Sequence, residues 1–198
     1  PSNRTRDRQI DVDHIKIDVT VDLKAQSVYG YVVHTLSPLQ SQLESFSLDA
    51  EDMVIRRVRV GDQDVEFDHF GEKVYISLPR SIGWYDTIDV RLDYNAKPRL
   101  GTFFFKPDET YPDQPWQAWT QGEEEDNHHW VPLYDYPNDR STFETILTVD
   151  QKFKAVSNGE LVSIKKNKNG THTWHWRENY PMVAYLISFV VGEYEKVE

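Results

Sequence analysis

Hydrophobic and polar residues alternate along much of the chain, and the clearest run lies near its start. The apolar positions of this run are Ile15, Ile17, Val19, Val21 and Leu23, and every residue between them is charged or polar. Because successive side chains of a strand point to opposite faces, this period of two predicts a half-buried strand. A second alternating run covers residues 28–36, after a gap of four residues. The two runs are predicted to pair as a hairpin.

The same alternation recurs through the rest of the first half of the chain. Residues 54–60 and 65–67 flank a Gly61-Asp62 turn, and we predict that they form a second hairpin. Two more strands are predicted over residues 74–78 and 88–94. No stretch of the first hundred residues keeps apolar positions at the i, i+3, i+4, i+7 spacing of an amphipathic helix. This half is therefore predicted to contain strands and no helix.

The pattern changes over residues 98–137. This stretch is rich in proline, carries Trp116, Trp119 and Trp130, and contains the acidic run 123–126. Aromatic side chains at this density favour burial. We therefore expect an ordered loop region here and not a linker.

Strand patterns return in the last third of the chain. Residues 143–149 and 161–164 are predicted strands, and Asn169-Gly170, a favoured hairpin turn, leads into a strand over 171–176. The near-continuous apolar run 184–191 predicts a strand that is buried on both faces. The expected fold is all-β, a twisted sandwich or saddle of two or three mostly antiparallel sheets, with residues 1–198 forming one domain.

Charge and composition narrow the range of partners. The 22 Lys and Arg residues against 33 Asp and Glu residues give a formal net charge of −11. Such a surface repels phosphate backbones and anionic lipid headgroups, so we expect neither a nucleic acid nor a membrane as the partner. The sequence contains no apolar run of about 18 residues, so we expect no membrane span.

Cysteine is absent from the chain, which excludes disulfides, thiolate nucleophiles and cysteine-based zinc sites. Because a protein outside the cytoplasm need not contain disulfides, the compartment stays open between the cytoplasm and a periplasmic or secreted location. The chemistry of the chain must therefore come from other side chains.

No complete catalytic motif occurs in the sequence. None of the seven histidines is followed by glutamate, so an H-E-x-x-H zinc helix is missing, and a P-loop, a G-x-G-x-x-G turn and a G-x-S-x-G elbow are missing too. His128 and His129 are adjacent, and neighbours in an extended segment point to opposite faces. We therefore expect no catalytic residue, metal ligand or cofactor site in this chain alone.

The acidic segment 121–126 is the best candidate for a binding site. Most charge runs are solvated loops, but this one lies among tryptophans and has Gly122, which permits a close backbone approach, at its second position. A carboxylate held by rigid neighbours is suited to receive a substrate ammonium, with a hydrogen bond of roughly 1.5 to 3 kcal/mol.

Several motifs resemble a known enzyme family. These are WTQGE at 119–123 and WVPLYDYPNDRSTFE at 130–144, with weaker support from HIKIDV at 14–19, AVSNGEL at 155–161 and PMVAYLISFVVG at 181–192. Together they resemble the amino-terminal domain of the zinc aminopeptidases that include alanyl aminopeptidase, the thermolysin-like gluzincin metallopeptidases. The resemblance extends over essentially the whole chain.

The resemblance implies a β domain that caps a zinc-containing catalytic domain on the same polypeptide, carboxy-terminal to this chain and absent from it. It implies that Glu123 binds the free amino terminus of the peptide substrate and that Gln121 lines the pocket for its first residue. A buried carboxylate left without its ammonium would then reject peptides that lack a free terminus. The chain departs from the family pattern at Asn127-His128, where Ala-Arg is common, and at Leu133-Tyr134, where Cys-Phe is common.

Two other functions remain open from the sequence. A β-sandwich with many tryptophans and acidic residues could be a carbohydrate-binding module, and a catalytically silent relative of the aminopeptidases could act as a scaffold. The sequence downstream of this chain separates the three hypotheses, because only an active peptidase requires an intact H-E-x-x-H helix.

Overall fold

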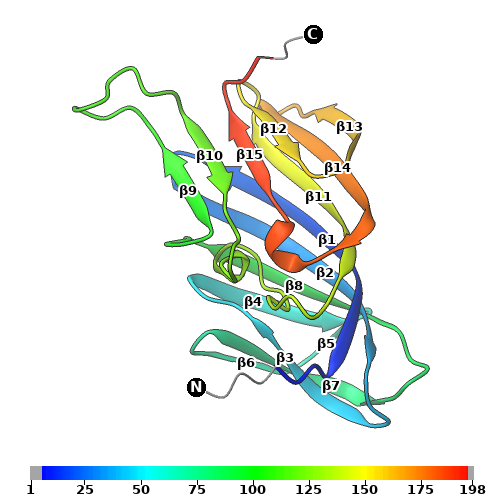
Figure 1. Ribbon diagram of the computed structural model, residues 1–198. Helices are drawn as coiled ribbons and strands as arrows, with labels where there is room; N and C mark the ends of the chain where they lie inside the picture. The colour runs from blue at the N-terminus through cyan, green and yellow to red at the C-terminus, as the bar shows by residue number, and fades with distance from the viewer. Residues whose placement is uncertain (1–5, 196–198) are drawn as a thin grey trace.

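The computed structural model describes residues 6–195, which form three β-sheets around a shared apolar core (Figure 1). The largest sheet has eight strands in the order β13-β14-β11-β1-β2-β8-β4-β5. Its strands are β1 (Ile10–Asp22), β2 (Ser27–Pro38), β4 (Met53–Val60), β5 (Gln63–Asp64), β8 (Ile88–Ala96), β11 (Ser141–Asp150), β13 (Glu160–Lys166) and β14 (Thr171–Met182).

Two smaller sheets complete the fold. One has the order β12-β15-β10-β9 and lies over the upper part of the large sheet in Figure 1, and the other has the order β3-β7-β6 and lies at its lower end. Their strands are β9 (Thr102–Phe105), β10 (Gln117–Thr120), β12 (Lys154–Ser157), β15 (Phe189–Gly192), β3 (Leu43–Asp49), β6 (Phe67–Phe70) and β7 (Lys73–Ile82). The all-β prediction of two or three mostly antiparallel sheets is confirmed.

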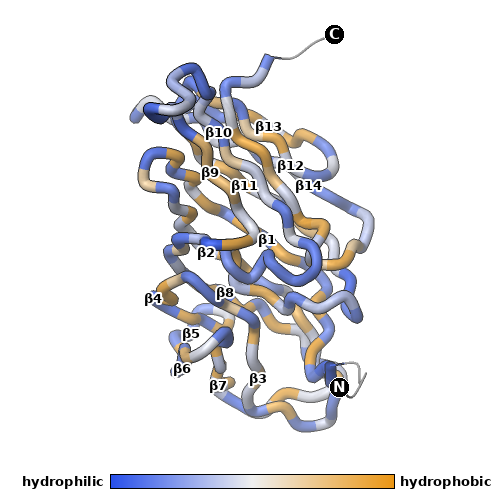
Figure 2. Tube along the Cα trace, turned by 60° about the vertical axis from the view of Figure 1, so that its left-hand side comes forward, coloured by the Kyte–Doolittle hydropathy of each residue, from blue (hydrophilic) through white to orange (hydrophobic). Residues whose placement is uncertain are grey.

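The alternating pattern explains the large sheet. Ile17 on β1, Val32 on β2 and Leu92 on β8 are fully buried, and polar residues between them face outward. Hydrophobic and hydrophilic positions accordingly alternate along these strands in Figure 2. Every strand pair of this sheet is antiparallel except β1 with β11, which run parallel.

Two predicted elements differ in the structure. The second hairpin forms across Gly61-Asp62, but its second arm is β5, followed by one bond from the Val65 N–H to the Val58 carbonyl. Phe67 instead begins β6, opposite Ile76 of another sheet. The apolar run 184–191 is not one strand. It begins as a 3₁₀ turn, η2 (Ala184–Leu186), and only its end forms β15. The carbonyls of Ala184 and Ile187 accept hydrogen bonds from the Asn127 side chain. They therefore do not pair with the backbone of a neighbouring strand.

The expected loop region over 98–137 is ordered and contains more structure than predicted. It includes the hairpin of β9 and β10 and a second 3₁₀ turn, η1 (Asn127–His129). Across residues 6–195, no helix has the length and apolar character that crossing a bilayer requires.

Candidate functional site

The segment that carries Gln121 and Glu123 follows directly after β10, an inner strand of the four-stranded sheet. The Gln121 backbone N–H donates to the Gly101 carbonyl at 3.0 Å, so the segment starts from a fixed position. The side chains of Gln121 and Glu123 are exposed, whereas Gly122 between them is buried. Within residues 6–195, the Glu123 carboxylate has no hydrogen bond or ion pair. It is therefore available to a ligand.

Gly122 lies against a buried amide, and this contact fixes the acidic loop from below. A Cβ added at Gly122 would lie 2.5 Å from Asn127 Nδ2, so a larger residue would displace the amide. The Asp126 backbone N–H also donates to the Gly122 carbonyl at 2.9 Å, which closes the loop. The close approach that a glycine permits at position 122 is thus used by the Asn127 side chain.

Asn127 is the buried anchor of this loop. Its Nδ2 donates to the carbonyls of Ala184 at 2.8 Å and Ile187 at 3.0 Å, and its Oδ1 accepts from Trp130 Nε1 at 2.8 Å. Trp130 is fully buried and packs edge-on against Phe189, with ring centroids 5.1 Å apart. These bonds satisfy the whole amide and tie the acidic loop to η2 and to Ile187 directly after it.

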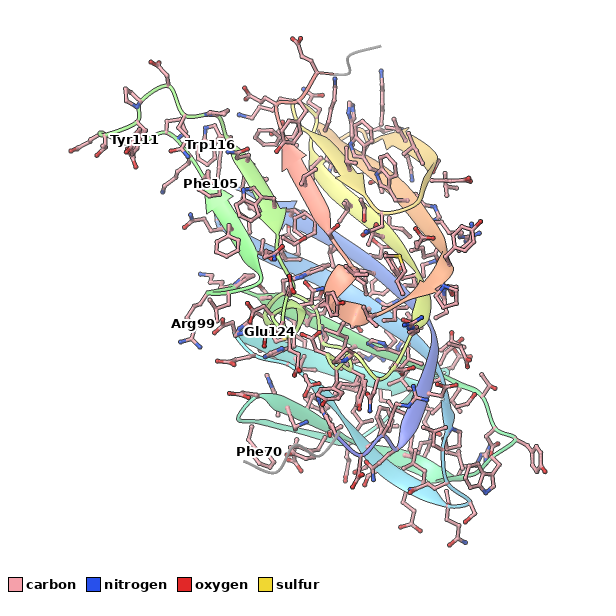
Figure 3. The ribbon with its side chains drawn as sticks, viewed as in Figure 1. Phe70, Arg99, Phe105, Tyr111, Trp116 and Glu124 are labelled. Carbon is pink, nitrogen blue, oxygen red and sulfur yellow. The ribbon has the colours of Figure 1, made fainter. Side chains whose placement is uncertain are left out.

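The three tryptophans near the loop have different surroundings. Trp130 lies in the core beneath it. Trp119 is half-buried on β10, where its ring stacks on Phe105 with centroids 5.8 Å apart and lies tilted against Phe103 with centroids 4.8 Å apart. Trp116 lies at the far end of β10 from Glu124, as Figure 3 shows. Two of the three tryptophans therefore flank the loop, and the third does not.

The acidic residues of the loop are not equivalent. Glu123, Glu124 and Glu125 are all exposed, but Glu125 also lies near the carboxylates of Asp135 and Asp49. Burial raises the pKa of Glu125 above its ordinary value, and the charges of Asp135 and Asp49 act in the same direction. The carboxylates of Asp135 and Asp49 thus make the surroundings of Glu125 more negative, although the charge of Arg6 acts against them.

Comparison with protein families identifies the chain. The model of the Peptidase M1 N-terminal domain matches residues 11–186. The chain belongs to this family. It is 22% identical over 189 residues to leucine aminopeptidase 2 of Vanderwaltozyma polyspora, a match that covers 92% of this chain and 28% of that protein. The M1 N-terminal domain described here therefore spans less than a third of the length of that relative.

Structural comparison agrees on the fold. An M1 zinc metallopeptidase of Deinococcus radiodurans, bound to a Tyr-Ser-Ala substrate, superposes with a TM-score of 0.81 at 24% identity, covering 93% of this chain and 43% of the other. The chain is also 23% identical over 218 residues to transcription initiation factor TFIID subunit 2 of Gallus gallus, covering 88% of this chain and 19% of that protein.

His128, which departs from the family pattern, is held in place by a buried aspartate. The His128 backbone N–H and its ring Nδ1 both lie 3.0 Å from Asp135 Oδ2. Burial lowers the pKa of His128, but the bond to Asp135 and the surrounding carboxylates outweigh burial, so the pKa lies above its ordinary value. The M1 N-terminal domain therefore holds this segment here through an imidazole and a buried aspartate.

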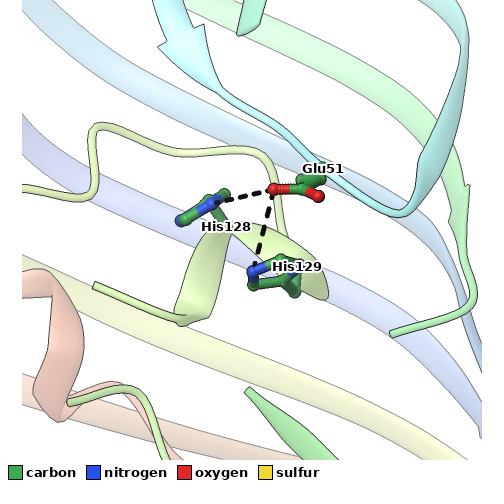
Figure 4. Close-up of side chains that lie close together, drawn as sticks. All are labelled: Glu51, His128 and His129. Carbon is green, nitrogen blue, oxygen red and sulfur yellow. Dashed lines mark ion pairs between the residues drawn. The ribbon is translucent and has the colours of Figure 1, made fainter. Parts of the chain in front are cut away.

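The expectation that His128 and His129 point apart is wrong, because they lie on η1 and not on an extended segment. Their rings stack with centroids 4.5 Å apart, and both face Glu51 of the β3–β4 loop (Figure 4). Sequence analysis did not single out Glu51, and it named Asn127 only as a departure from the family pattern. The available signal was the Gly122 position, which requires a close partner, whereas nothing in the sequence indicates that residue 51 approaches residue 128.

Proposed function

We propose that this chain is the non-catalytic amino-terminal domain of a zinc-dependent aminopeptidase and that it binds the amino terminus of the peptide substrate. Glu123 accepts hydrogen bonds from the substrate α-ammonium, and Gln121 contacts the first residue. The chain itself performs no bond cleavage. It sets which peptide bond reaches the catalytic centre, because the anchored terminus fixes the register of the peptide.

The observation that carries this proposal is the exposed, unpaired Glu123 carboxylate on a loop fixed from below by Gly122 and Asn127. A loop held in this way loses little conformational entropy when it binds a ligand. One charge-assisted hydrogen bond to a carboxylate contributes roughly 1.5 to 3 kcal/mol. That range is enough to select peptides with a free terminus from those without one.

The zinc of the proposed enzyme would be held by another part of the polypeptide. No histidine of this chain is followed by glutamate, so these residues do not fit the H-E-x-x-H helix of such a centre. When bound, that zinc would polarise the scissile carbonyl and activate a water molecule. The contribution of the present residues is to bind and orient the substrate.

A row of apolar side chains beside the loop supports a covering domain. Val156, Val190, Trp119 and Phe103 pair in register across β12, β15, β10 and β9, and therefore share one face of the sheet. Val156 is 41% exposed and Val190 is 36% exposed, and the two aromatic rings are half-buried. We propose that the catalytic domain of the same polypeptide covers this row.

The test uses the polypeptide that includes the downstream domain. Glu123→Gln keeps the shape of the side chain and removes its charge, so kcat/KM on peptides with a free amino terminus should fall roughly 10- to 100-fold. Glu124→Gln is the matched control, since Glu124 is exposed on the same loop, and it should change kcat/KM less than about twofold. Equal effects of the two substitutions would contradict the anchoring role.

One comparison favours a second candidate, a catalytically silent scaffold. A matched relative has the name of a transcription initiation factor subunit and not of a peptidase. The downstream sequence decides between the two. An intact H-E-x-x-H helix together with zinc-dependent hydrolysis of amino-acid anilides supports the peptidase, and a degenerate motif without hydrolysis supports the scaffold.

A further inference from the structure

Glu51, His128 and His129 form a compact group on the face of η1 that points to the β3–β4 loop (Figure 4). Glu51 Oε2 lies 3.9 Å from Nε2 of each imidazole. The Glu51 backbone N–H also donates to the His128 carbonyl at 3.0 Å, so the two segments have a fixed relative position. Three potential ligand atoms within 4.8 Å of one another thus converge on one point.

The hydrogen bonds of the two rings determine which nitrogen is free. His128 Nδ1 faces Asp135 Oδ2 at 3.0 Å, and His129 Nδ1 faces Asp52 Oδ2 at 2.8 Å. An ionised carboxylate only accepts hydrogen bonds, so each Nδ1 must carry the proton. In the neutral rings, both Nε2 atoms are then unprotonated, and within residues 6–195 neither has a hydrogen-bond donor. Two lone pairs and a carboxylate oxygen therefore face one another.

The Glu51 carboxylate is also oriented by a hydrogen bond on its far side. Arg99 Nη2 donates to Glu51 Oε1 at 2.7 Å, which leaves Oε2 directed at the imidazoles. Metal-bound histidines and carboxylates in proteins are typically held by such outer hydrogen bonds. The carboxylates of Glu51, Asp52 and Asp135 against the guanidinium of Arg99 leave a net charge of two negatives around the ligand atoms. This charge matches a divalent cation.

We propose that Glu51, His128 and His129 bind a divalent transition-metal ion of the zinc class. Imidazole nitrogen favours zinc, copper, nickel or cobalt over magnesium and calcium, which prefer oxygen ligands. A tetrahedral zinc with ligands at 2.0 to 2.1 Å separates them by about 3.3 Å, so the three side chains need to move by roughly 1 Å or less. Water takes the fourth position.

Access to this site is open from one side. Glu51 and Asp52 border a surface groove of about 760 Å³, and the Glu51 side chain is 25% exposed. The imidazoles are more deeply placed, with side-chain exposures of 15% for His128 and 5% for His129. An ion can therefore enter along Glu51 and be shielded from solvent by the two rings.

A second group of the same residue types serves as an internal control. Glu144 lies between His14 and His175, but Lys16 and Arg177 also contact its carboxylate, at 3.5 and 3.1 Å. His175 Nε2 already bonds Glu144 Oε2 at 2.6 Å. Two nearby cations and an occupied nitrogen make this group unsuitable for a metal ion.

The test is a titration of the untagged, chelator-treated 198-residue chain with Co²⁺, followed by displacement with Zn²⁺. We expect one equivalent of Co²⁺ with the intense visible absorption of a tetrahedral site, and a rise in Tm on adding Zn²⁺. Asp52→Asn removes an outer partner and should weaken binding about 10- to 100-fold. Asparagine suits the left-handed backbone of residue 52, where φ is 56°, so the loop is preserved.

Removing a ligand should have a larger effect. Glu51→Gln and His128→Gln should each weaken Co²⁺ binding more than about 100-fold, and His175→Gln should leave it unchanged. If one ligand variant fails to fold, X-ray absorption of the zinc-loaded wild-type chain must still show two imidazole ligands.

Three results would overturn the proposal. The first is the absence of tetrahedral Co²⁺ absorption, and the second is Co²⁺ binding that survives both ligand substitutions. The third is an NMR spectrum in which His128 Nε2 carries a proton and which does not change when Zn²⁺ is added.

Discussion

The eight-stranded sheet and the segment from Gln121 to Asp139 are stabilised by different interactions. In the sheet, buried positions are apolar with few exceptions, and the backbone groups bond to neighbouring strands. In the segment, buried polar side chains bond to the backbone of distant elements. Asn127 binds η2, and Asp139 accepts from the Val12 N–H. In the reverse direction, Asp49 of β3 accepts from the Asp135 N–H of the segment.

This difference determines what each region tolerates. A sheet residue contributes mainly through the apolar area that it buries, so another apolar residue of similar volume can replace it at small cost. A buried amide or carboxylate that bonds backbone groups has no such substitute, because its loss leaves those groups unsatisfied. The segment that presents Glu123 is therefore the region where chemistry, and not volume, limits substitution.

Trp130 belongs to both kinds of region, since it fills the core and donates to Asn127. Trp130→Ala should lower the free energy of unfolding by about 3 to 5 kcal/mol, the largest effect that we predict. Trp130→Phe keeps most of the apolar volume and removes the Nε1 donor, so its loss should be nearer 1 kcal/mol. Urea unfolding measures both, and equal losses would show that the hydrogen bond, not the packing, dominates.

Asparagine offers a direct comparison of the two regions. Asn127→Ala leaves two carbonyls and the Trp130 N–H without their partner, so we expect a loss of about 2 to 3 kcal/mol. Asn95→Ala on β8 is the control, because within residues 6–195 that half-buried side chain makes no hydrogen bond, and it should lose less than about 0.5 kcal/mol. Similar losses in thermal melts would remove the distinction between sheet and segment.

His34 joins the two regions, because it is buried on β2 with Nε2 at 2.9 Å from the Pro132 carbonyl oxygen. Burial lowers its pKa from 6.5 to about 4, although the bond to Pro132 acts in the opposite direction. The unfolded chain therefore takes up a proton that the folded chain does not, between pH 6.5 and about 4. The His34 contribution to stability is complete above this window and is lost as pH falls through it.

From pH 7 to pH 5 this loss should be about 2 kcal/mol. Denaturant unfolding of the wild type and of His34→Gln at both pH values measures the free energy of unfolding. The wild type should lose about 2 kcal/mol more than the variant between pH 7 and pH 5. The prediction is wrong if the two proteins lose the same stability on acidification.

The smallest predicted effect tests the contact under the acidic loop. Gly122→Ala forces its new methyl group against Asn127 and should cost roughly 1 to 2 kcal/mol. In an Asn127→Ala background the methyl group has room, so the same substitution should cost almost nothing there. Additive losses in this double-mutant cycle would mean that Gly122 is needed for some other reason.

The sequence predicted the sheet better than the segment because period-two alternation is a local signal. The β1–β2 hairpin and β8 follow from it directly, whereas β3 was not predicted because a bulge between Leu43 and Ser45 breaks the alternation. The 3₁₀ turn at Ala184 depends on Asn127, 57 positions earlier, and residue patterns alone do not reveal such a partner.

The same limit applies to the site. The motif around Glu123 was found from its resemblance to a family, and the residue type of Gly122 indicated only that a close backbone approach is permitted there. The convergence of Glu51 with His128 depends on long-range pairing, here the bridge between Asp49 and Leu133, which no local pattern specifies. Sequence reasoning therefore located the loop, but it rejected the pair of His128 and His129 and missed Glu51.

The parallel pair of β1 and β11 has a consequence for how the chain folds. It joins His14 to Thr142, 128 positions apart, at the middle of the large sheet. On one side lie β2, β8, β4 and β5 from the first half of the chain, and on the other lie β14 and β13 from the last third. Each block forms through nearer contacts, and the seam closes a long loop at a high entropic cost. On a ribosome, the first block would present the open edge of β1 until residues 141–150 have emerged, and this exposed edge is where association between nascent chains would start.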